Sequence, residues 1–320
     1  MAPVLLALRQ RSGFIPTLIA TSQHGALFDQ ALQPFGIAPD RWLEMPPPGL
    51  SPDAMADAIE AGLIPHLRKG QPDLVLVQGD TTSALAAARA AAQCGIPVGH
   101  VEAGLRSHDL ERPWPEEGNR IAIDQIATLL FAPTEGNMDN LAADPAVAGK
   151  ACLTGNTGID ALLHIRRGMT SRTTRRNCIH VLVTLHRRET IGEPLRKICQ
   201  ILAALAKREN VFLTLPVHPN PDVKRIVRNA LEGQARIALI DPLPYPEMID
   251  CMASSDLILS DSGGVQEETT YLGVPCLTLR PNTERPVTIT HGTNRLVASH
   301  REAVLQAARD LLNTDRVRCD

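Results

Sequence analysis

Short apolar runs rich in β-branched residues alternate with helical stretches along the whole 320-residue chain, and this alternation limits the fold most strongly. Such a rhythm is typical of parallel sheets with helices on both faces. In the first half we expect strands at 17–20, 74–77, 98–101 and 129–132. In the second half we expect them at 180–184, 211–215, 237–240, 257–259 and 276–279. The sequence therefore predicts an α/β protein with two Rossmann-like αβα domains.

The domain boundary is expected at residues 168–177, which are polar, basic and without an apolar period. This linker would separate an N-terminal domain, residues 1–167, from a C-terminal domain, residues 178–320. With 44% hydrophobic residues the chain is long enough for two ordinary cores.

Composition argues against several classes of protein. A formal net charge of -3 gives no electrostatic reason to expect a nucleic-acid partner. No apolar run approaches the roughly 20 residues that span a bilayer, and no signal peptide opens the chain. Seven cysteines without Cys-x-x-Cys spacing indicate thiols in a reducing compartment. We expect a cytoplasmic protein that does not bind membranes.

Familiar cofactor and metal motifs are missing from the sequence. No Gly-x-Gly-x-x-Gly follows an expected strand, and there is no Walker lysine motif, no His-Glu-x-x-His and no cluster of His and Cys. Nicotinamide and metal chemistry are therefore not expected, and we predict no cofactor.

The expected strand at 257–259 leads directly into Ser262, Gly263 and Gly264 and then a helix. Backbone N–H groups at such a helix N-terminus can bind a phosphate without any lysine. A plain strand-to-helix turn, with Ser and Gly chosen for capping, explains this segment equally well.

Three carboxylates follow expected strands or begin a helix in the first half: Asp80, Glu102 and Glu116. Taken singly, they could be an N-cap, a partner of Arg106 and a complement to a helix dipole. Because ligands of parallel sheets bind beyond the carboxyl ends of strands, the three together favour a catalytic cleft between the domains. Acid/base chemistry on a phosphate-bearing substrate is the simplest interpretation.

Ordered motifs across nearly the whole chain carry a resemblance to a known family. They read GDTT at 79–82, HVEAGLR at 100–106, PWPEEGNR at 113–120, TGNT at 154–157, VTLHRRE at 183–189, PVH at 216–218, DSGGVQEE at 261–268 and TERP at 283–286. In this order they resemble the non-hydrolysing UDP-N-acetylglucosamine 2-epimerases.

The resemblance implies a fold like that of the GT-B glycosyltransferases, with a UDP-sugar bound between two domains. It implies that UDP is eliminated to give a 2-acetamidoglucal and then added back with the opposite configuration at C2. Asp80, Glu102 and Glu116 would be the acid/base residues, and His186 would help hold the departing UDP. His186 could instead be a loop residue that caps a strand exit.

The resemblance also implies further ligands and a homodimer. The residues expected to bind substrate are Arg106, Arg187, Ser262, Gly263, Gly264, Glu268 and Arg285. A regulatory nucleotide site would involve Gln23, His24 and His218. Two alternatives remain open at this stage: a glycosyltransferase that uses a UDP-sugar, and a UDP-sugar-binding homologue without catalysis.

Both ends of the sequence differ from the family pattern. The chain opens in an apolar helical pattern, where the family has a strand and a Gly-Thr-Arg-Pro-Glu loop. It also stops after a helix expected at 304–312. Without the first strand, neighbouring strands would lack ladder partners. We therefore expect a shortened homologue whose activity is weak or absent.

Overall fold

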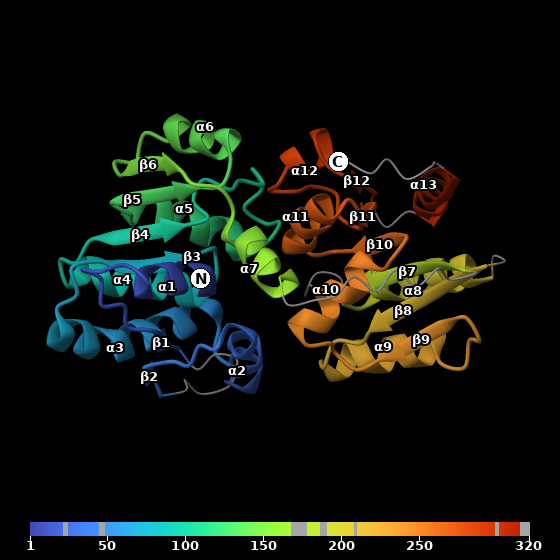
Figure 1. Ribbon diagram of the computed structural model, residues 1–320, viewed down its shortest axis with the longest axis horizontal. Coiled ribbons are helices and arrows are strands. Elements are labelled where there is room, and N and C mark those ends of the chain that lie inside the picture. The colour runs from blue at the N-terminus through green and yellow to red at the C-terminus, as the bar shows by residue number, and fades with distance from the viewer. Residues whose placement is uncertain are drawn as a thin grey trace. The chain divides into compact units, whose positions relative to one another are not determined.

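The computed structural model describes residues 1–21, 25–44, 49–167, 178–185, 191–207, 210–297 and 301–313. The chain divides into two compact units, unit 1 at residues 1–164 and unit 2 at residues 165–320 (Figure 1). Each unit is described by itself below. The linker expected at 168–177 lies outside the described residues.

Unit 1 contains a four-stranded parallel sheet in the order β3-β4-β5-β6. Its strands are β3 (Val75–Gln78), β4 (Val98–Val101), β5 (Leu129–Ala132) and β6 (Lys150–Leu153). All four residues of β4, an interior strand, are buried. The carboxyl ends of these strands lie at one edge because all of the pairs are parallel.

Two further strands of unit 1, β1 (Ile19–Ala20) and β2 (Arg41–Trp42), form a separate parallel pair. Among the described strands, β3 is therefore at the edge of its sheet, and β1 pairs only with β2. The hydroxyl of Thr21, just after β1, donates to Ser83 Oγ at 3.1 Å.

The helices of unit 1 begin where the sequence supplies caps. Ser51 accepts from the Ala54 N–H at the start of α3, and Thr81 accepts from the Ala84 N–H at the start of α4, each at 3.2 Å. Alanines give α4 a narrow surface that packs against α3 and α5. The helices are α1 (Ala2–Arg9), α2 (Gly25–Leu32), the short 3₁₀ helix η1 (Gln33–Phe35), α3 (Pro52–Gly70), α4 (Thr82–Gln93), α5 (Glu116–Ile126), α6 (Glu135–Ala143) and α7 (Thr157–Arg166), whose last two residues belong to unit 2.

Unit 2 contains a six-stranded parallel sheet in the order β12-β11-β10-β7-β8-β9. The order reverses between β7 and β10, which is where ligands bind in open sheets of this kind. The strands are β7 (Ile179–Thr184), β8 (Val211–Pro216), β9 (Ile237–Ile240), β10 (Leu257–Ser260), β11 (Cys276–Thr278) and β12 (Asn294–Leu296).

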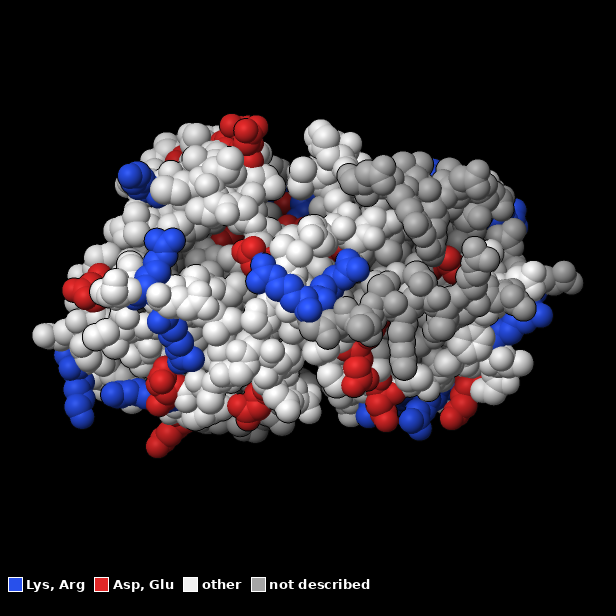
Figure 2. Space-filling model, in the orientation of Figure 1, with Lys and Arg blue, Asp and Glu red and all other residues white. Residues whose placement is uncertain are grey.

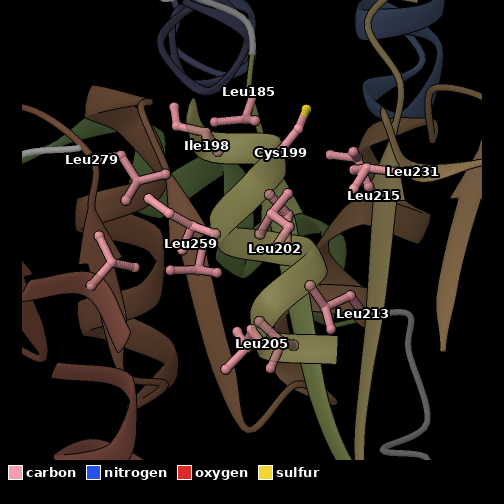
Figure 3. Packing of buried hydrophobic residues seen from close by; sticks show 14 of the residues in the cluster. Leu185, Ile198, Cys199, Leu202, Leu205, Leu213, Leu215, Leu231, Leu259 and Leu279 are labelled. Carbon is pink, nitrogen blue, oxygen red and sulfur yellow. The ribbon is translucent and has the colours of Figure 1, made fainter. Parts of the chain in front are cut away.

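The largest core of unit 2 forms where α8 packs on the sheet. Figure 3 shows Ile198, Leu202 and Leu205 of α8 beside Leu213 and Leu259 of the strands. Each fully buried leucine of this kind stabilises the fold by about 1.5–3 kcal/mol. The helices of unit 2 are α8 (Glu193–Ala206), α9 (Pro221–Leu231), α10 (Tyr245–Ala253), α11 (Gly263–Leu272), α12 (Val287–Thr290) and α13 (Arg301–Asn313).

No helix among the described residues is long and apolar enough to cross a membrane. On the face drawn in Figure 2, blue and red side chains are interspersed across the described surface rather than gathered by sign. This mixed pattern agrees with the small net charge of -3.

Candidate active site

The register of β3 and β4 places two of the predicted carboxylates side by side. Gln78 at the end of β3 pairs with Val101 at the end of β4, and the Gly79 N–H donates to the Val101 carbonyl at 3.0 Å. Gly79 and Glu102 are the next residues along the two strands, and Asp80 follows Gly79. Parallel pairing therefore brings the backbone segments that hold Asp80 and Glu102 next to each other, and a joint role for the two side chains stays a prediction.

Glu102 has an unusual backbone conformation, with φ at 71°. A non-glycine residue in this left-handed region costs of order 1–3 kcal/mol and is found most often at functional sites. A Cβ placed on Gly79 would lie 3.5 Å from Glu102 Oε2. The Glu102 carboxylate therefore lies against the backbone that leads to Asp80.

Asp80 is held by α5 rather than used as a helix cap, because Thr81 is the N-cap of α4. Its Oδ2 accepts from Arg120 Nε at 3.1 Å and also from Arg120 Nη2, and its carbonyl accepts from Asn119 Nδ2 at 2.8 Å. No bond to Oδ1 is found among the described residues. Because the Asp80 side chain is 26% exposed, Oδ1 is available to a ligand.

Glu116 and Glu117 open α5 and have different surroundings. Glu117 is 1% exposed, bonds Arg120 Nη1 through Oε2 at 2.6 Å and accepts the N–H groups of Ser107 and His108. Glu116 Oε2 is buried and has no hydrogen-bond partner in the part of the chain that is described. An unpaired buried carboxylate oxygen is costly, and a functional role is one reason why such a group is retained. Glu117 thus has structural partners, whereas Glu116 Oε2 is suited to reaction chemistry.

Arg106 pairs with Asp124 of α5, at 2.7 Å between Nη1 and Oδ2. Asp124 is fully buried and also contacts His100 of β4, at 2.6 Å between His100 Nδ1 and Oδ1. The Gly104 N–H completes the set with a bond to Asp124 Oδ2 at 3.2 Å. Arg106, predicted to bind substrate, is therefore 8% exposed, and its guanidinium is bound to a protein carboxylate.

In unit 2 the strand β10 ends at Ser260, and α11 starts at Gly263 with Ser262 as N-cap. The Ser262 side chain makes no capping bond, and its N–H donates to Ser260 Oγ at 3.0 Å. The predicted strand-to-helix turn is therefore present. We refer to residues 262–264 as the 262–264 turn.

The Arg285 side chain lies directly over this turn. A Cβ on Gly263 would collide with Arg285 Nη1 and come within 2.6 Å of Glu284 Oε1, so a larger residue here would have to displace these side chains. Arg285 Nε contacts Glu267 Oε2 at 2.8 Å, and Nη1 contacts Glu284 Oε1 at 2.5 Å. Arg285, also predicted to bind substrate, therefore places a cation beside the helix N-terminus while it bonds two carboxylates.

Glu268, predicted to bind a ribose, accepts a hydrogen bond from Tyr245 Oη at 2.7 Å. The pKa of Glu268 is raised to about 7, chiefly by burial and also by the neighbouring Glu267 carboxylate, against the opposite effect of the Tyr245 hydrogen bond. The pKa of Tyr245 is also raised, by burial and by the Glu268 charge. Glu268 is thus a carboxyl group close to its titration point at neutral pH.

Four of the predicted site residues, His186, Arg187, Gln23 and His24, lie outside the described residues. His218, the remaining residue of the predicted regulatory site, lies just after β8 and accepts a hydrogen bond from the Asn220 N–H through Nδ1 at 3.2 Å. This bond fits the role of a turn residue, and a regulatory role for His218 stays a prediction.

Sequence reasoning missed Arg120, Asp124 and His100 as members of the site. Glu116, Arg120 and Asp124 are spaced four apart along α5, which places them on one face of the helix. A stripe of charged residues on a helix that also contains buried Ile123 was the signal that could have found them. Within the described residues, no group of three or more His, Cys, Asp or Glu could hold a metal ion.

Two αβα units, with carboxylates beyond the strands of one and a strand-to-helix turn in the other, define a two-domain α/β enzyme with a GT-B-like fold. A family model described as UDP-N-acetylglucosamine 2-epimerase matches residues 6–319. The chain belongs to this family. Both the fold class and the family resemblance expected from the sequence are thereby confirmed.

Individual relatives agree with the family model. The UDP-N-acetylglucosamine 2-epimerase of Escherichia coli O157:H7 is 40% identical, over 98% of this chain and 87% of its own length. A crystal structure of UDP-GlcNAc 2-epimerase from Neisseria meningitidis bound to UDP-GlcNAc has a TM-score of 0.92 and 37% identity, and covers 97% of this chain and 87% of its own. The S. aureus MnaA–UDP structure has a TM-score of 0.91 and 34% identity, with 99% and 85% covered.

Proposed function

We propose that this protein interconverts UDP-N-acetylglucosamine and UDP-N-acetylmannosamine. Family membership supports the reaction class, and two similar structures contain UDP-GlcNAc or UDP. The single observation that carries the proposal is the adjacency of Asp80 and Glu102 beyond β3 and β4, with Glu116 at the start of the helix that bonds Asp80.

The chemistry of the substrate explains why carboxylates suffice. The C2 proton of the sugar is not acidic enough for easy direct removal. In the proposed route a base takes this proton while the bond between C1 and the UDP oxygen breaks, which gives UDP and a 2-acetamidoglucal. The UDP oxygen then adds back to C1, and an acid delivers a proton to the opposite face of C2. No redox cofactor or metal takes part.

The described carboxylates supply groups for both proton transfers. Asp80 is oriented through Oδ2, which leaves Oδ1 for proton exchange, and Glu116 Oε2 has no partner among the described residues. Glu102 lies against the Gly79 backbone in its left-handed conformation. Geometry precedes pKa in choosing acid and base residues, and the positions of Asp80 and Glu102 beyond neighbouring strands support their roles.

In unit 2 the 262–264 turn would bind the diphosphate through the α11 N-terminus, with added positive charge from Arg285. Glu268 would accept hydrogen bonds from the ribose hydroxyls once the nucleotide displaces or joins Tyr245 Oη. His186 and Arg187 would hold the departing UDP, and Arg106 would bind the substrate. A second nucleotide at Gln23, His24 and His218 would regulate the reaction.

The reaction is tested by incubating the protein with UDP-N-acetylglucosamine and, separately, with UDP-N-acetylmannosamine, and separating the products by chromatography. We expect each sugar to yield the other and both mixtures to reach the same ratio. Transfer of the sugar to an added acceptor would indicate a glycosyltransferase instead. Binding of UDP without conversion would indicate a nucleotide-sugar-binding protein, and either result would contradict the proposal.

We also propose that the protein acts in the cytoplasm as a homodimer. Similar structures that contain UDP-GlcNAc or UDP support a nucleotide sugar as the partner. Light scattering on the purified protein tests the dimer, and a monomeric mass across the micromolar range would contradict it.

A further inference from the structure

We propose that His100 is a positioning residue, an imidazole protonated on both nitrogens that fixes the Gly79 carbonyl and thereby orients Asp80. This inference rests on the proposed function, because its kinetic test measures epimerisation. His100 is 0% exposed in the interior strand β4. It therefore acts through the backbone rather than by contact with substrate.

Both ring nitrogens of His100 face oxygen atoms. Nε2 lies 2.9 Å from the Gly79 carbonyl oxygen, and Nδ1 lies 2.6 Å from Asp124 Oδ1. A peptide carbonyl only accepts hydrogen bonds, so Nε2 must have a proton. Nδ1 and Oδ1 then share one further proton, which belongs either to the ring or to the carboxyl group.

The surroundings of Asp124 decide where this proton resides. Its Oδ2 accepts from the Arg106 guanidinium at 2.7 Å and from the Gly104 N–H at 3.2 Å. These donors and the Arg106 charge favour an ionised Asp124 carboxylate. The charged side chains of this cluster are Asp124, which contacts the ring, and Arg106, which contacts Asp124. The proton is therefore placed on Nδ1, which makes His100 a buried imidazolium.

Helix α5 holds the Asp80 segment both through direct hydrogen bonds and through His100. Directly, Asn119 bonds the Asp80 carbonyl and Arg120 bonds its carboxylate. Indirectly, Asp124 bonds His100, and His100 bonds the Gly79 carbonyl, one peptide before Asp80. Because Gly79 has a φ of 70° and can rotate easily, its carbonyl needs such a partner to stay in one orientation.

His100 also links the two catalytic strand exits. Gly104 ends the turn that begins with Glu102, and its N–H donates to Asp124 Oδ2, the carboxylate that also contacts His100. The Gly104 carbonyl accepts from Asn137 and Asn140 at 3.1 and 2.9 Å. Loss of the imidazole would therefore loosen Asp80 relative to Glu102. Displacement of a catalytic group by about 1 Å can reduce a rate by about 10²-fold.

Two substitutions separate the two bonds of the ring. In His100→Gln the amide nitrogen can reach the position of Nε2 and donate to Gly79. In His100→Asn the amide reaches only the position of Nδ1, so the bond to Gly79 is lost. His180 supplies a matched control, since it is 3% exposed in β7 of unit 2 and its ring contacts Thr214 and Ser255 at 2.8 and 3.2 Å.

We expect His100→Asn to lower kcat by about 10- to 100-fold with KM and the affinity for UDP changed less than about threefold. His100→Gln should recover kcat to within about fivefold of the unsubstituted protein, and His180→Asn should keep kcat despite a similar fall in Tm. The proposal would be overturned if kcat of His100→Asn stayed within twofold of the unsubstituted protein, or if His180→Asn lost as much kcat as His100→Asn.

The protonation state is measured independently of activity by ¹⁵N NMR of histidine-labelled protein at pH 7.5, with His100→Gln identifying the signal. Two protonated ring nitrogens for His100 are expected. An unprotonated Nδ1 would overturn the imidazolium assignment, even if His100→Asn fails to fold. If the unsubstituted protein shows no epimerisation, the proposed function fails, while this NMR result still decides the state of the ring.

Discussion

Arg120 binds Asp80 Oδ2 through both Nε and Nη2, and its remaining terminal nitrogen, Nη1, binds Glu117 at 2.6 Å. One buried guanidinium thus joins a carboxylate at the candidate site to one that fixes a neighbouring loop. Because Arg120 is only 2% exposed, water cannot take the place of its guanidinium beside either carboxylate without a cost in free energy.

Removal of the Asp80 charge should abolish most activity without unfolding the protein. In Asp80→Asn the amide oxygen can still accept from Arg120, so the local structure is kept, while the group can no longer take up a proton. We expect kcat to fall by about 10²-fold or more, as for other lost acid/base groups. Stopped assays of epimer formation measure this change, with UDP affinity as the control. A kcat within threefold of the original would contradict the assignment.

Removal of Arg120 should be far more destabilising than removal of an exposed arginine in the same kind of pair. Arg120→Met leaves buried carboxylates without their cation and should lower the free energy of unfolding by about 3–5 kcal/mol. Arg196, which pairs with Glu193 at the same i,i+3 spacing but is 54% exposed, is the matched control. Arg196→Met should cost about 0.5 kcal/mol or less. Urea titration compares the two variants, and equal losses would refute the structural account of Arg120.

Two adjacent glycines of α11 should respond oppositely to alanine. A methyl group on Gly263 meets Arg285 and Glu284, whereas one on Gly264 has no heavy atom within 4 Å. Gly263→Ala should therefore lower the free energy of unfolding by about 1–3 kcal/mol. Gly264→Ala should leave it unchanged or raise it by up to about 1 kcal/mol, because alanine favours the helix. Chemical denaturation tests the pair, and a tolerated Gly263→Ala would show that Arg285 does not lie over the turn.

Protonation of Glu268 should make stability depend on pH. Its pKa is raised from 4.5 to about 7, so the folded state binds more protons than the unfolded state between these values. The associated stabilisation is full below about pH 4.5 and is lost as the pH rises through about 7. Glu268→Gln remains uncharged and should be more stable than the original protein at pH 8, by on the order of 1–3 kcal/mol, and similar at pH 4.5.

Glu232→Gln, at an exposed carboxylate, controls for the general effect of removing one negative charge. Thermal unfolding at the two pH values gives the comparison. If Glu268→Gln gains the same stability at both pH values, the raised pKa of Glu268 is wrong.

The strands that sequence patterns predicted well include both interior and edge strands. The runs at 98–101, 129–132 and 237–240 coincide with β4, β5 and β9, of which β4 and β5 are interior strands and β9 lies at a sheet edge. Three strands were missed: β2, β6 and β12. β2 is exposed, β6 and β12 contain charged or polar residues, and β6 and β12 lie at sheet edges. Such strands are specified by their neighbours rather than by their own periodicity.

The site could be predicted only in part for a similar reason. Asp80 and Glu102 follow recognisable strands, so parallel pairing alone brings them together. Arg120 and Asp124 act from the buried face of a helix, where a charged residue breaks the apolar period and identifies no partner by itself. Gly79 and His100 are 21 residues apart, and only the folded register shows that they are bonded.

Proton NMR with UDP-N-acetylglucosamine in deuterated water follows the C2 proton, which must leave the sugar if UDP is eliminated. We expect that anomeric signals of the manno epimer appear and that deuterium enters C2 of the sugar nucleotides as they interconvert. Epimer formed without deuterium would contradict proton exchange by these carboxylates. Unchanged UDP-N-acetylglucosamine after long incubation, with UDP still bound, would contradict the epimerase itself.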